Sequence, residues 1–323
     1  MLFAITLLLP WLLQSARSDR LTELVEKMRL LTLRGDHQAL GGSLIPVVLE
    51  ELVKPHPNAS SAWNQVGLYF QTQGDYAAAE RAYQRGMRLV QKEGKAGEPD
   101  LLLLLNLATL YLETRQHPVQ ADTLGRRALK QAIGFYGPAS PELAKFLYIL
   151  GSVRQRQSDR KGARRYFQEA LDLAGDRPDG KLLQGYVRAS LGILSASGGQ
   201  WIDARESLIQ SIAPIETYFG TSHPVAISAH LNLARVYAHL KQWPLANASL
   251  ARAREITEAR LGPDHRLMAE ILATSASVLQ KTGLRREARD LERRAKSIAA
   301  AQPKNSALQP SIDFVDLIQS GRR

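Results

Sequence analysis

The sequence predicts an all-α protein, an α-solenoid of stacked antiparallel helix pairs. A pattern of two amphipathic helical segments recurs along most of the chain and is clearest from Leu231 to Ala269. A small residue also recurs in the second segment of each copy, with four steps of 42 residues and one of 41: Ala79, Ala121, Ala163, Ala204, Ala246 and Ala288. Stacked helix pairs need small residues where their backbones approach closely, so this spacing predicts a helical repeat.

Two further columns of small residues agree with the first. One lies seven residues later in the second helix and reads Gly86, Ala128, Ala170, Ser211, Ala253 and Ala295. The other lies in the first helix and reads Gly67, Ala108, Gly151, Gly192, Ala234 and Ala276. Because three columns agree over the same copies, we expect about six repeats between residues 58 and 300.

These residues resemble the tetratricopeptide repeat (TPR) family, whose unit is a helix, a turn and an antiparallel helix. The usual period of that family is about 34 residues. The longer period here, with the segment Leu231–Tyr237 and the connector Leu261–His265, is similar to the 42-residue subclass found in kinesin light chains. The resemblance covers roughly residues 60–298 and implies a right-handed solenoid. In some copies another residue replaces the aromatic one at the turn position. This position reads Tyr76, Pro118, Arg160, Trp201, Trp243 and Arg285.

Residues 1–18 are expected to be a signal peptide. Residues 2–13 are apolar, but a membrane-spanning helix needs about 20 residues. Ala16 and Ser18 are small and suit cleavage before Asp19. This interpretation predicts an exported protein, periplasmic or secreted. An uncleaved membrane anchor and a wrongly assigned start or buried first helix are the alternatives, and the protein would then be membrane-anchored or cytoplasmic.

Residues 19–57 are expected to form a degenerate helix pair that caps the array. Apolar residues follow helical spacing from Leu21 to Leu33 and again from Leu44 to Val53, and prolines at 55 and 57 stop the second segment. Terminal repeats are expected to be atypical because one of their faces meets water.

Polar residues mark the helix starts of the repeats. We expect N-caps at Ser60 or Ser61, Asp75, Asp159 and Asp264, with Pro141 in the first turn of a helix that Ser140 begins.

Residues 301–323 are expected to form a flexible tail. The stretch from 302 to 310 is polar and holds two prolines. It leads to the acidic and apolar segment Ser311–Ile318, which is either a frayed end or a segment that docks through Asp313 and Asp316 on arginines of its own chain or another.

The resemblance implies a partner on the concave groove formed by the first helices. One column of that surface reads Gln65, Asn106, Ile149, Ser190, Asn232 and Thr274. Asn106 and Asn232 match the asparagine that the family places on its groove, where the amide can bond a peptide backbone as donor and acceptor. Alternatively, these amides satisfy neighbouring helix groups or water. Adding Arg235, one turn after Asn232, the candidate groove residues are Gln65, Asn106, Ser190, Asn232, Arg235 and Thr274.

The net charge of +11 suits an acidic protein partner or an anionic membrane surface. A second-helix column reads Arg85, Arg127, Glu169, Gln210, Arg252 and Arg294. Acidic residues lie near these arginines in the sequence, and mixed signs are typical of a solvated surface rather than of a phosphate track. A scaffold that binds a protein or peptide is therefore the first prediction, and a basic nucleic-acid-binding solenoid is the alternative.

The residues that catalysis or metal binding would need do not form a recognisable motif. The chain has no cysteine, which excludes disulfides and zinc-thiolate sites. Its seven histidines show no HExxH spacing, and no GxSxG, P-loop or Rossmann glycine pattern is present. His223 and His265 hold equivalent connector positions, which favours a repeated structural role. We therefore expect no catalytic residues, no metal and no cofactor.

Overall fold

The computed structural model describes residues 20–31, 39–53, 56–93, 98–114, 117–223 and 225–301. The predicted signal peptide at 1–18 lies outside these residues, as does the predicted tail at 301–323 apart from Ala301, which ends the last helix. The chain divides into two compact units, the first ending at Pro138 and the second beginning at Ala139.

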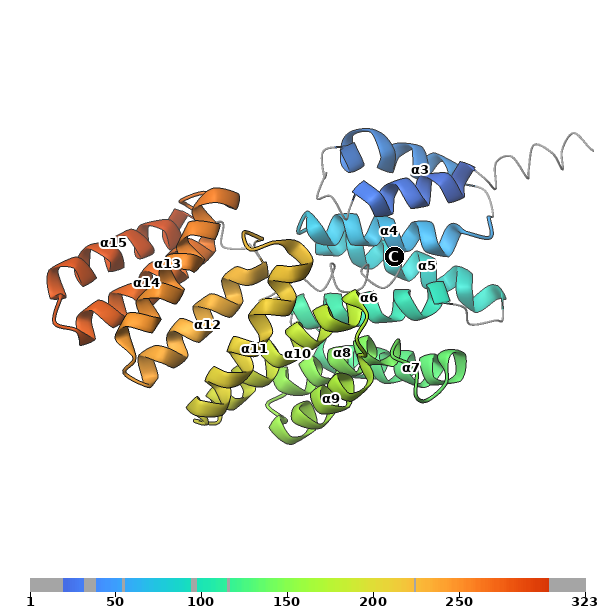
Figure 1. Cartoon of the computed structure of the whole chain (residues 1–323). Coiled ribbons are helices and arrows are strands. Elements are labelled where there is room, and N and C mark those ends of the chain that lie inside the picture. Colours follow the sequence, from blue (N-terminus) through green and yellow to red (C-terminus); the bar gives the residue numbers. More distant parts are fainter. Residues whose placement is uncertain are drawn as a thin grey trace, which may run out of the picture. The chain divides into compact units, whose positions relative to one another are not determined.

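The first unit consists of antiparallel helices that pack in consecutive pairs (Figure 1). It begins with a helix at residues 20–31, which is followed by a π-helical turn, η1 (Leu40–Leu44), that continues into α3 (Ile45–Glu51). The two complete pairs of this unit are α4 (Ala59–Thr72) with α5 (Tyr76–Glu93), and α6 (Glu98–Thr114) with α7 (Pro118–Tyr136).

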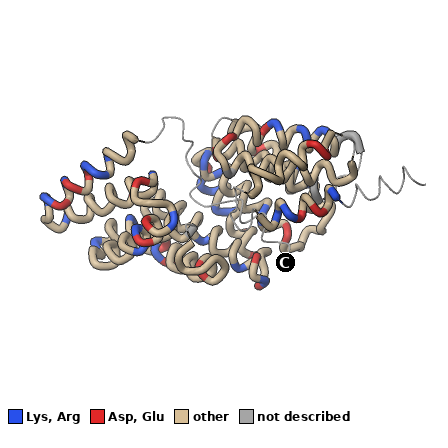
Figure 2. The backbone as a smooth tube through the Cα atoms, turned by 90° about the horizontal axis from the view of Figure 1, so that it is seen from above, with Lys and Arg blue, Asp and Glu red and all other residues tan. Residues whose placement is uncertain are grey.

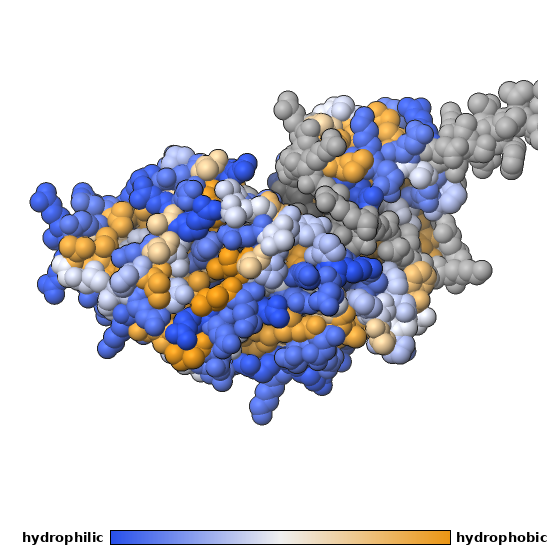
Figure 3. Space-filling view, viewed as in Figure 1, coloured by the Kyte–Doolittle hydropathy of each residue, from blue (hydrophilic) through white to orange (hydrophobic). Residues whose placement is uncertain are grey.

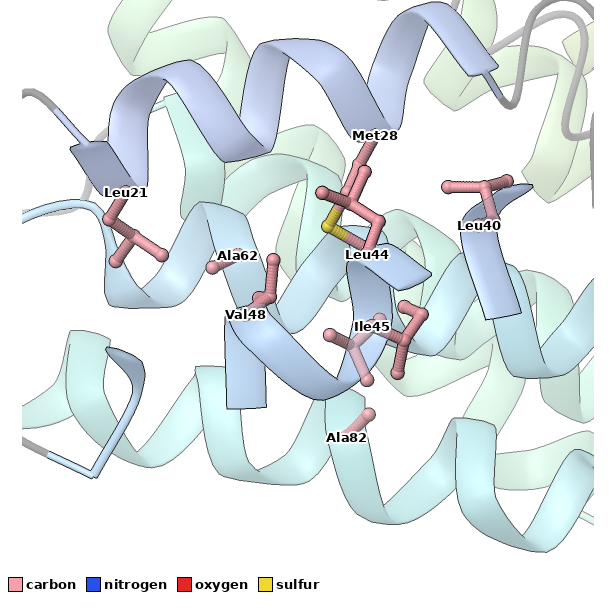
Figure 4. Packing of buried hydrophobic residues seen from close by; sticks show 9 residues of the cluster. Leu21, Met28, Leu40, Leu44, Ile45, Val48, Ala62 and Ala82 are labelled. Carbon is pink, nitrogen blue, oxygen red and sulfur yellow. The ribbon is translucent and has the colours of Figure 1, made fainter. Parts of the chain in front are cut away.

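The N-terminal helices pack on the first complete pair through a continuous hydrophobic core (Figure 4). Leu21 and Met28 are two helical turns apart and therefore lie on one face of the helix at residues 20–31. They are fully buried against Leu44 and Val48, and the core continues to Ala62 of α4. Burial of a leucine, valine or methionine contributes about 1.5–3 kcal/mol, so these contacts stabilise the packing of the N-terminal helices on the repeats.

The second unit contains four helix pairs, in which each helix packs most extensively on its own partner. The pairs are α8 (Leu143–Arg156) with α9 (Arg160–Leu173), α10 (Pro178–Ser197) with α11 (Trp201–Phe219), α12 (Val225–His239) with α13 (Trp243–Arg260), and α14 (Arg266–Lys281) with α15 (Arg285–Ala301).

The small residues of the repeat lie where the two helices of a pair touch. A Cβ atom at Gly67 would lie 2.4 Å from the ring of Tyr83, and a Cβ atom at Gly151 would lie 2.5 Å from the ring of Phe167. Both distances are far below van der Waals contact, which is about 3.5–4.0 Å between carbons. Glycine thus allows a bulky side chain of the second helix to lie directly on the backbone of the first, and the predicted close approach is confirmed.

The turn within each pair has the same backbone form in most copies. Second helices begin at Tyr76, Pro118, Arg160, Trp201, Trp243 and Arg285, the residues of the predicted turn position. The residue two places before that position has a positive φ at Gly74, Ser158, Gly199, Lys241 and Gly283. Glycine adopts this left-handed conformation at no steric cost, whereas Ser158 and Lys241 adopt it with strain.

Two of the predicted N-caps are confirmed, and others are wrong. The carboxylates of Asp75 and Asp159 accept hydrogen bonds of 2.9 Å from the amides of Ala78 and Gly162. At α14 the cap is His265 instead of Asp264, because His265 has the extended backbone of a cap and its Nδ1 accepts from the Leu267 amide.

Two helices begin at positions that differ from the prediction. α4 begins at Ala59, before Ser60, with Asn58 as a cap residue whose side chain donates to Thr22 instead of to its own helix. α8 begins at Leu143, so Pro141 belongs to the preceding turn.

The described residues are almost entirely helical and contain no strand. Within each unit, antiparallel pairs follow one another and stack through their neighbouring helices. The predicted fold class, an all-α solenoid of stacked helix pairs, is therefore confirmed. Within the described parts of the chain, we find no helix that combines the length and the apolar character needed to cross a membrane.

Candidate binding surface

The predicted groove residues all lie on the first helices of their pairs, in two groups. Gln65 on α4 and Asn106 on α6 belong to the first unit. The other four belong to the second unit, with Ser190 on α10, Asn232 and Arg235 on α12, and Thr274 on α14. The structure therefore provides two candidate surfaces, one in each unit.

In the first unit, Asn106 joins two neighbouring first helices. Its side chain is 1% exposed, and its Nδ2 donates to Oδ1 of Asn64 on α4 over 2.7 Å. The carbonyl oxygen of the Asn106 side chain has no hydrogen-bond partner in the described structure. The N–H donor of this amide is thus used inside the protein, as expected if these asparagines satisfy groups of neighbouring helices. Its carbonyl acceptor is not used in this way.

Gln65 lies beside a cavity of about 160 Å³ on the surface of the first helices. The lining comes from the helix at residues 20–31, from α4 and its cap residue, and from α6: Thr22, Val25, Glu26, Arg29, Asn58, Ser61, Asn64, Gln65 and Leu102. Gln65 is half-buried, and its Oε1 atom is buried without a hydrogen-bond donor in the described part of the chain. Because this oxygen is buried, a ligand in the cavity can bond it only when the Gln65 side chain turns toward the cavity.

The other polar groups around this cavity are partly neutralised by each other. Arg29 forms an ion pair with Glu26 at 2.9 Å, and Nδ2 of Asn58 donates to the hydroxyl of Thr22 at 2.6 Å. The cavity is therefore lined by paired charges and short polar side chains, together with the side chain of Gln65. This arrangement suits a neutral ligand that donates a hydrogen bond, such as a backbone N–H.

A buried polar network in the same unit could not be predicted from the sequence pattern. Nε2 of Gln71 on α4 donates to the carboxylate of Glu113 on α6 at 2.8 Å, and the Tyr83 hydroxyl donates to Oε1 of Gln71 at 2.7 Å. Burial, and secondly the charge of Glu113, raise the pKa of Tyr83 well above its ordinary value, so it stays a donor. The only feature of the sequence that pointed to this contact is the 42-residue separation of Gln71 and Glu113, which are both polar residues in buried helical segments.

In the second unit, the predicted residues form a polar group across α12 and α14. Nη1 of Arg235 donates to Oδ1 of Asn232 at 3.3 Å, and Nη2 of Arg235 pairs with Glu270 at 3.3 Å. The Thr274 hydroxyl donates to the backbone carbonyl of Glu270 at 2.8 Å. Arg235 is exposed and Glu270 is half-buried. A surface pair of this kind contributes at most about 1 kcal/mol, so a partner can displace it.

Ser190 lies apart from this surface group because it is buried. Its side chain is 6% exposed and bonds the hydroxyl of Tyr148 on α8 over 3.5 Å. Burial raises the pKa of Tyr148 to about 12, so the phenol remains neutral. Ser190 therefore joins two first helices in the interior, and Glu270 is the surface residue that the sequence analysis missed.

Exposed hydrophobic side chains do not single out another surface in the second unit. Figure 3 shows a largely hydrophilic surface with hydrophobic patches between the polar side chains. The large exposed ones are Ile202 and Ile209 on α11, Leu245 on α13 and Leu284 before α15. They occupy three separate segments, so the polar residues of the first helices are the better guide to a binding surface.

Several arginines on the second helices are engaged with neighbours. Arg85 lies over the ring of Trp63 at 5.0 Å, and Arg252 pairs with Glu255 at 2.7 Å. Similar pairs on second helices are Arg126 with Asp122, Arg165 with Glu169, and Arg254 with Glu258. This mixture of signs is the one expected of a solvated surface. Within the described ranges, no three acidic or histidine side chains are grouped as a metal site would require.

Antiparallel helix pairs that stack in sequence, with polar side chains along the first helices, define a helical repeat protein of the α-solenoid class. Residues 225–301 match the family model described as the tetratricopeptide repeat. Residues 225–301 therefore consist of tetratricopeptide repeats, as the repeat columns predict for this part of the chain. Membership of the 42-residue kinesin light chain subclass stays a prediction.

Solved structures with a similar fold include several assemblies and sensors. The chain resembles a chain of the APC/C hetero-tetramer Cut9-Hcn1 with a TM-score of 0.63 and 15% identity over 90% of its own length, which corresponds to 48% of that chain. It thus spans about half of that longer protein.

Two further structures are matched over most of their length. The Rap protein complexed with Competence and Sporulation Factor has a TM-score of 0.57 and 12% identity, covering 89% of this chain and 97% of that one. BtubC (BKLC) from P. vanneervenii has a TM-score of 0.51 and 21% identity, covering 77% and 92%. Identities this low show a shared fold alone. Comparison with curated protein sequences gives no match.

Proposed function

We propose that the protein is a non-catalytic scaffold that binds a peptide or protein partner on the surface of its first helices. One observation carries this proposal. The cavity between three first helices is lined by Gln65, whose buried side-chain oxygen has no donor among the described residues. An unsatisfied buried acceptor costs about 1–3 kcal/mol, so an incoming N–H group that bonds it recovers a penalty that the free protein carries.

A peptide in extended form is the ligand that fits this chemistry. Its backbone offers N–H donors and C=O acceptors at regular intervals, and the cavity of about 160 Å³ has room for a small side chain beside the backbone. The polar group of Asn232, Arg235 and Glu270 in the second unit supplies a charged surface where an acidic side chain of a partner can replace Glu270 on Arg235.

The similar folds support this class of function. The Rap protein forms a complex with Competence and Sporulation Factor, and Cut9 forms a hetero-tetramer with Hcn1. Tetratricopeptide repeats generally serve as non-catalytic scaffolds, and stacked repeats expose long surfaces on which a partner can lie.

The test is an affinity capture with the chain from Asp19 to Arg323 as bait, followed by affinity measurements on the proteins that are captured. Gln65→Ala on α4 is compared with Gln120→Ala, an exposed glutamine of α7 in the same unit. Loss of one hydrogen bond of about 0.5–1.5 kcal/mol predicts a two- to tenfold weaker complex for Gln65→Ala. Gln120→Ala should bind like the unmodified chain.

The second unit is tested in the same way with two matched pairs. Asn232→Ala is compared with Asn247→Ala, and Arg235→Ala with Arg254→Ala, because Asn247 and Arg254 are exposed on α13 and Arg254 has its own acid partner. Circular dichroism must show equal helix content. If captured proteins bind all variants equally, the first-helix surface is not the binding site.

Nucleic-acid binding and export are separate proposals with their own tests. If nucleic acid is the only species captured, and its affinity falls steeply with salt, the alternative of a basic nucleic-acid-binding solenoid replaces the scaffold. Export through residues 1–18 predicts that the N-terminus of the mature protein, read by mass spectrometry, is Asp19. An N-terminus at Met1 contradicts it.

A further inference from the structure

The exposed face of α15 is a row of cations. Arg286, Arg289, Arg293 and Lys296 recur at steps of three, four and three residues and therefore lie on one side of the helix. Together with Asp290 and Glu292 they line a surface hollow of about 390 Å³. We call these four cations the α15 basic face, and Figure 2 shows basic positions recurring along this helix.

The cations of the α15 basic face are poorly compensated. Arg293 pairs with Asp290, whereas Arg286, Arg289 and Lys296 have no ion pair with any described residue. The first turn of α15 also holds two basic residues, Arg285 and Arg286, beside one acid, Glu287. The positive end of a helix dipole disfavours cations there and favours an anion. This surface therefore attracts an acidic segment.

We propose that the segment of residues 311–318 of the same chain docks on the α15 basic face through Asp313 and Asp316. The two acids are three residues apart, which is the spacing of Arg286 and Arg289 and again of Arg293 and Lys296. The long stems of arginine and lysine provide apolar surface beside their charges. They can cover the isoleucine, valine and leucine side chains that flank the two acids.

The chain between the two elements is long enough for this contact. Residues 302–310 separate Ala301, the last residue of α15, from the segment. Nine residues span up to about 30 Å when extended, and the 17 residues of α15 are about 25 Å long at 1.5 Å per residue. The segment can therefore reach any part of the α15 basic face, and the short tether gives it a high effective concentration there.

The absence of cysteine from the chain permits a direct test on the full-length protein. Ser311→Cys carries a single nitroxide label, and the broadening of amide signals in α15 is measured by NMR at low salt and at high salt. Docking predicts strong broadening in α15 that is reduced several-fold at about 0.5 M salt, where the Debye length falls to a few ångströms.

Charge variants of both sides identify the contact. Asp313→Lys/Asp316→Lys and Arg286→Gln/Arg289→Gln should each remove most of the broadening. Arg81→Gln/Arg88→Gln, which changes two exposed arginines of α5, should leave it unchanged. Circular dichroism confirms that helix content is equal in all variants.

Four results would overturn the proposal. The first is no broadening in α15 at low salt, and the second is broadening that all charge variants retain. The third is broadening that appears only when a labelled chain is mixed with an unlabelled, isotope-enriched chain, because the segment would then dock on a second copy. If the unlabelled chain instead binds an acidic peptide of unrelated sequence as tightly as a synthetic 311–318 peptide, the basic face serves an external acidic partner.

Discussion

Replacing Gly151 by alanine should destabilise the second unit, although alanine is the better helix former. The new Cβ atom would lie 2.5 Å from Cδ1 and Cε1 of Phe167, about 1 Å inside normal carbon contact. Phe167 is fully buried and packs on Tyr148 at a ring-centroid distance of 5.8 Å, so its ring has no free space to enter.

The two opposing contributions can be compared. Overpacking a core costs typically about 1–3 kcal/mol, and this contact is at the upper end because the ring and both backbones are held. The change from glycine to alanine inside a helix stabilises the folded state by about 1 kcal/mol. We therefore expect Gly151→Ala to lower the free energy of unfolding by about 1–2 kcal/mol, measured by urea denaturation of the full chain followed by circular dichroism.

Two variants give this measurement its controls. Gly134→Ala makes the same change in α7, where a Cβ atom would meet nothing within 4 Å, and it should stabilise the first unit by up to about 1 kcal/mol. Gly151→Ala/Phe167→Leu should recover part of the loss, because copy five combines Ala234 with Leu250 at the equivalent positions. If Gly151→Ala is as stable as the unmodified protein, the helices of a pair do not touch as closely as described.

Three further changes test the polar parts of the fold. Tyr83→Phe leaves Oε1 of Gln71 buried without its donor and should cost about 1–3 kcal/mol in urea denaturation. Lys241→Gly relieves a left-handed residue with φ of 58° and should raise the melting temperature, with a gain of up to about 1 kcal/mol. Burial, and secondly Arg266, lower the pKa of His265. As the pH falls, His265 is therefore protonated in the unfolded chain at a higher pH than in the folded protein. The contribution of neutral His265 to stability is present above about pH 6.5 and is lost below it. His265→Asn keeps a capping acceptor, so its unfolding free energy should fall less between about pH 7.5 and 5.5.

The pairing of helices could be predicted because its cause is visible in single residues. Close backbone approach requires glycine or alanine, so the columns that include Gly67 and Gly151 identified the contacts that the structure contains. The turn position was equally predictable, since second helices begin at the residues from Tyr76 to Arg285 that share its spacing. Steric requirements repeat with the period of the fold, so the residues that meet them recur in every copy of the sequence.

The polar contacts could be predicted only in part, because a polar side chain does not reveal its partner. Asn106 was expected on a groove, and the structure shows that its donor is used by Asn64. Gln65 was placed in the same column and retains an acceptor beside a cavity. The cap at His265 was missed because a histidine caps a helix only when its Nδ1 is unprotonated and can accept a hydrogen bond, as it does here from the Leu267 amide. These differences depend on neighbours that are distant in the sequence.

The hydrogen bonds between α4 and α6 make the order of the copies matter. Asn64 bonds Asn106 and Gln71 bonds Glu113, each pair 42 residues apart. At the positions that correspond to Asn106 and Glu113, the fifth copy carries Asn232 and His239. Moving that copy beside α4 would keep the first bond but set an imidazole against Gln71 in place of a carboxylate. Copies with the same backbone are therefore not exchangeable modules, and shuffling or deleting them in engineered arrays will succeed only where the polar contacts move with them.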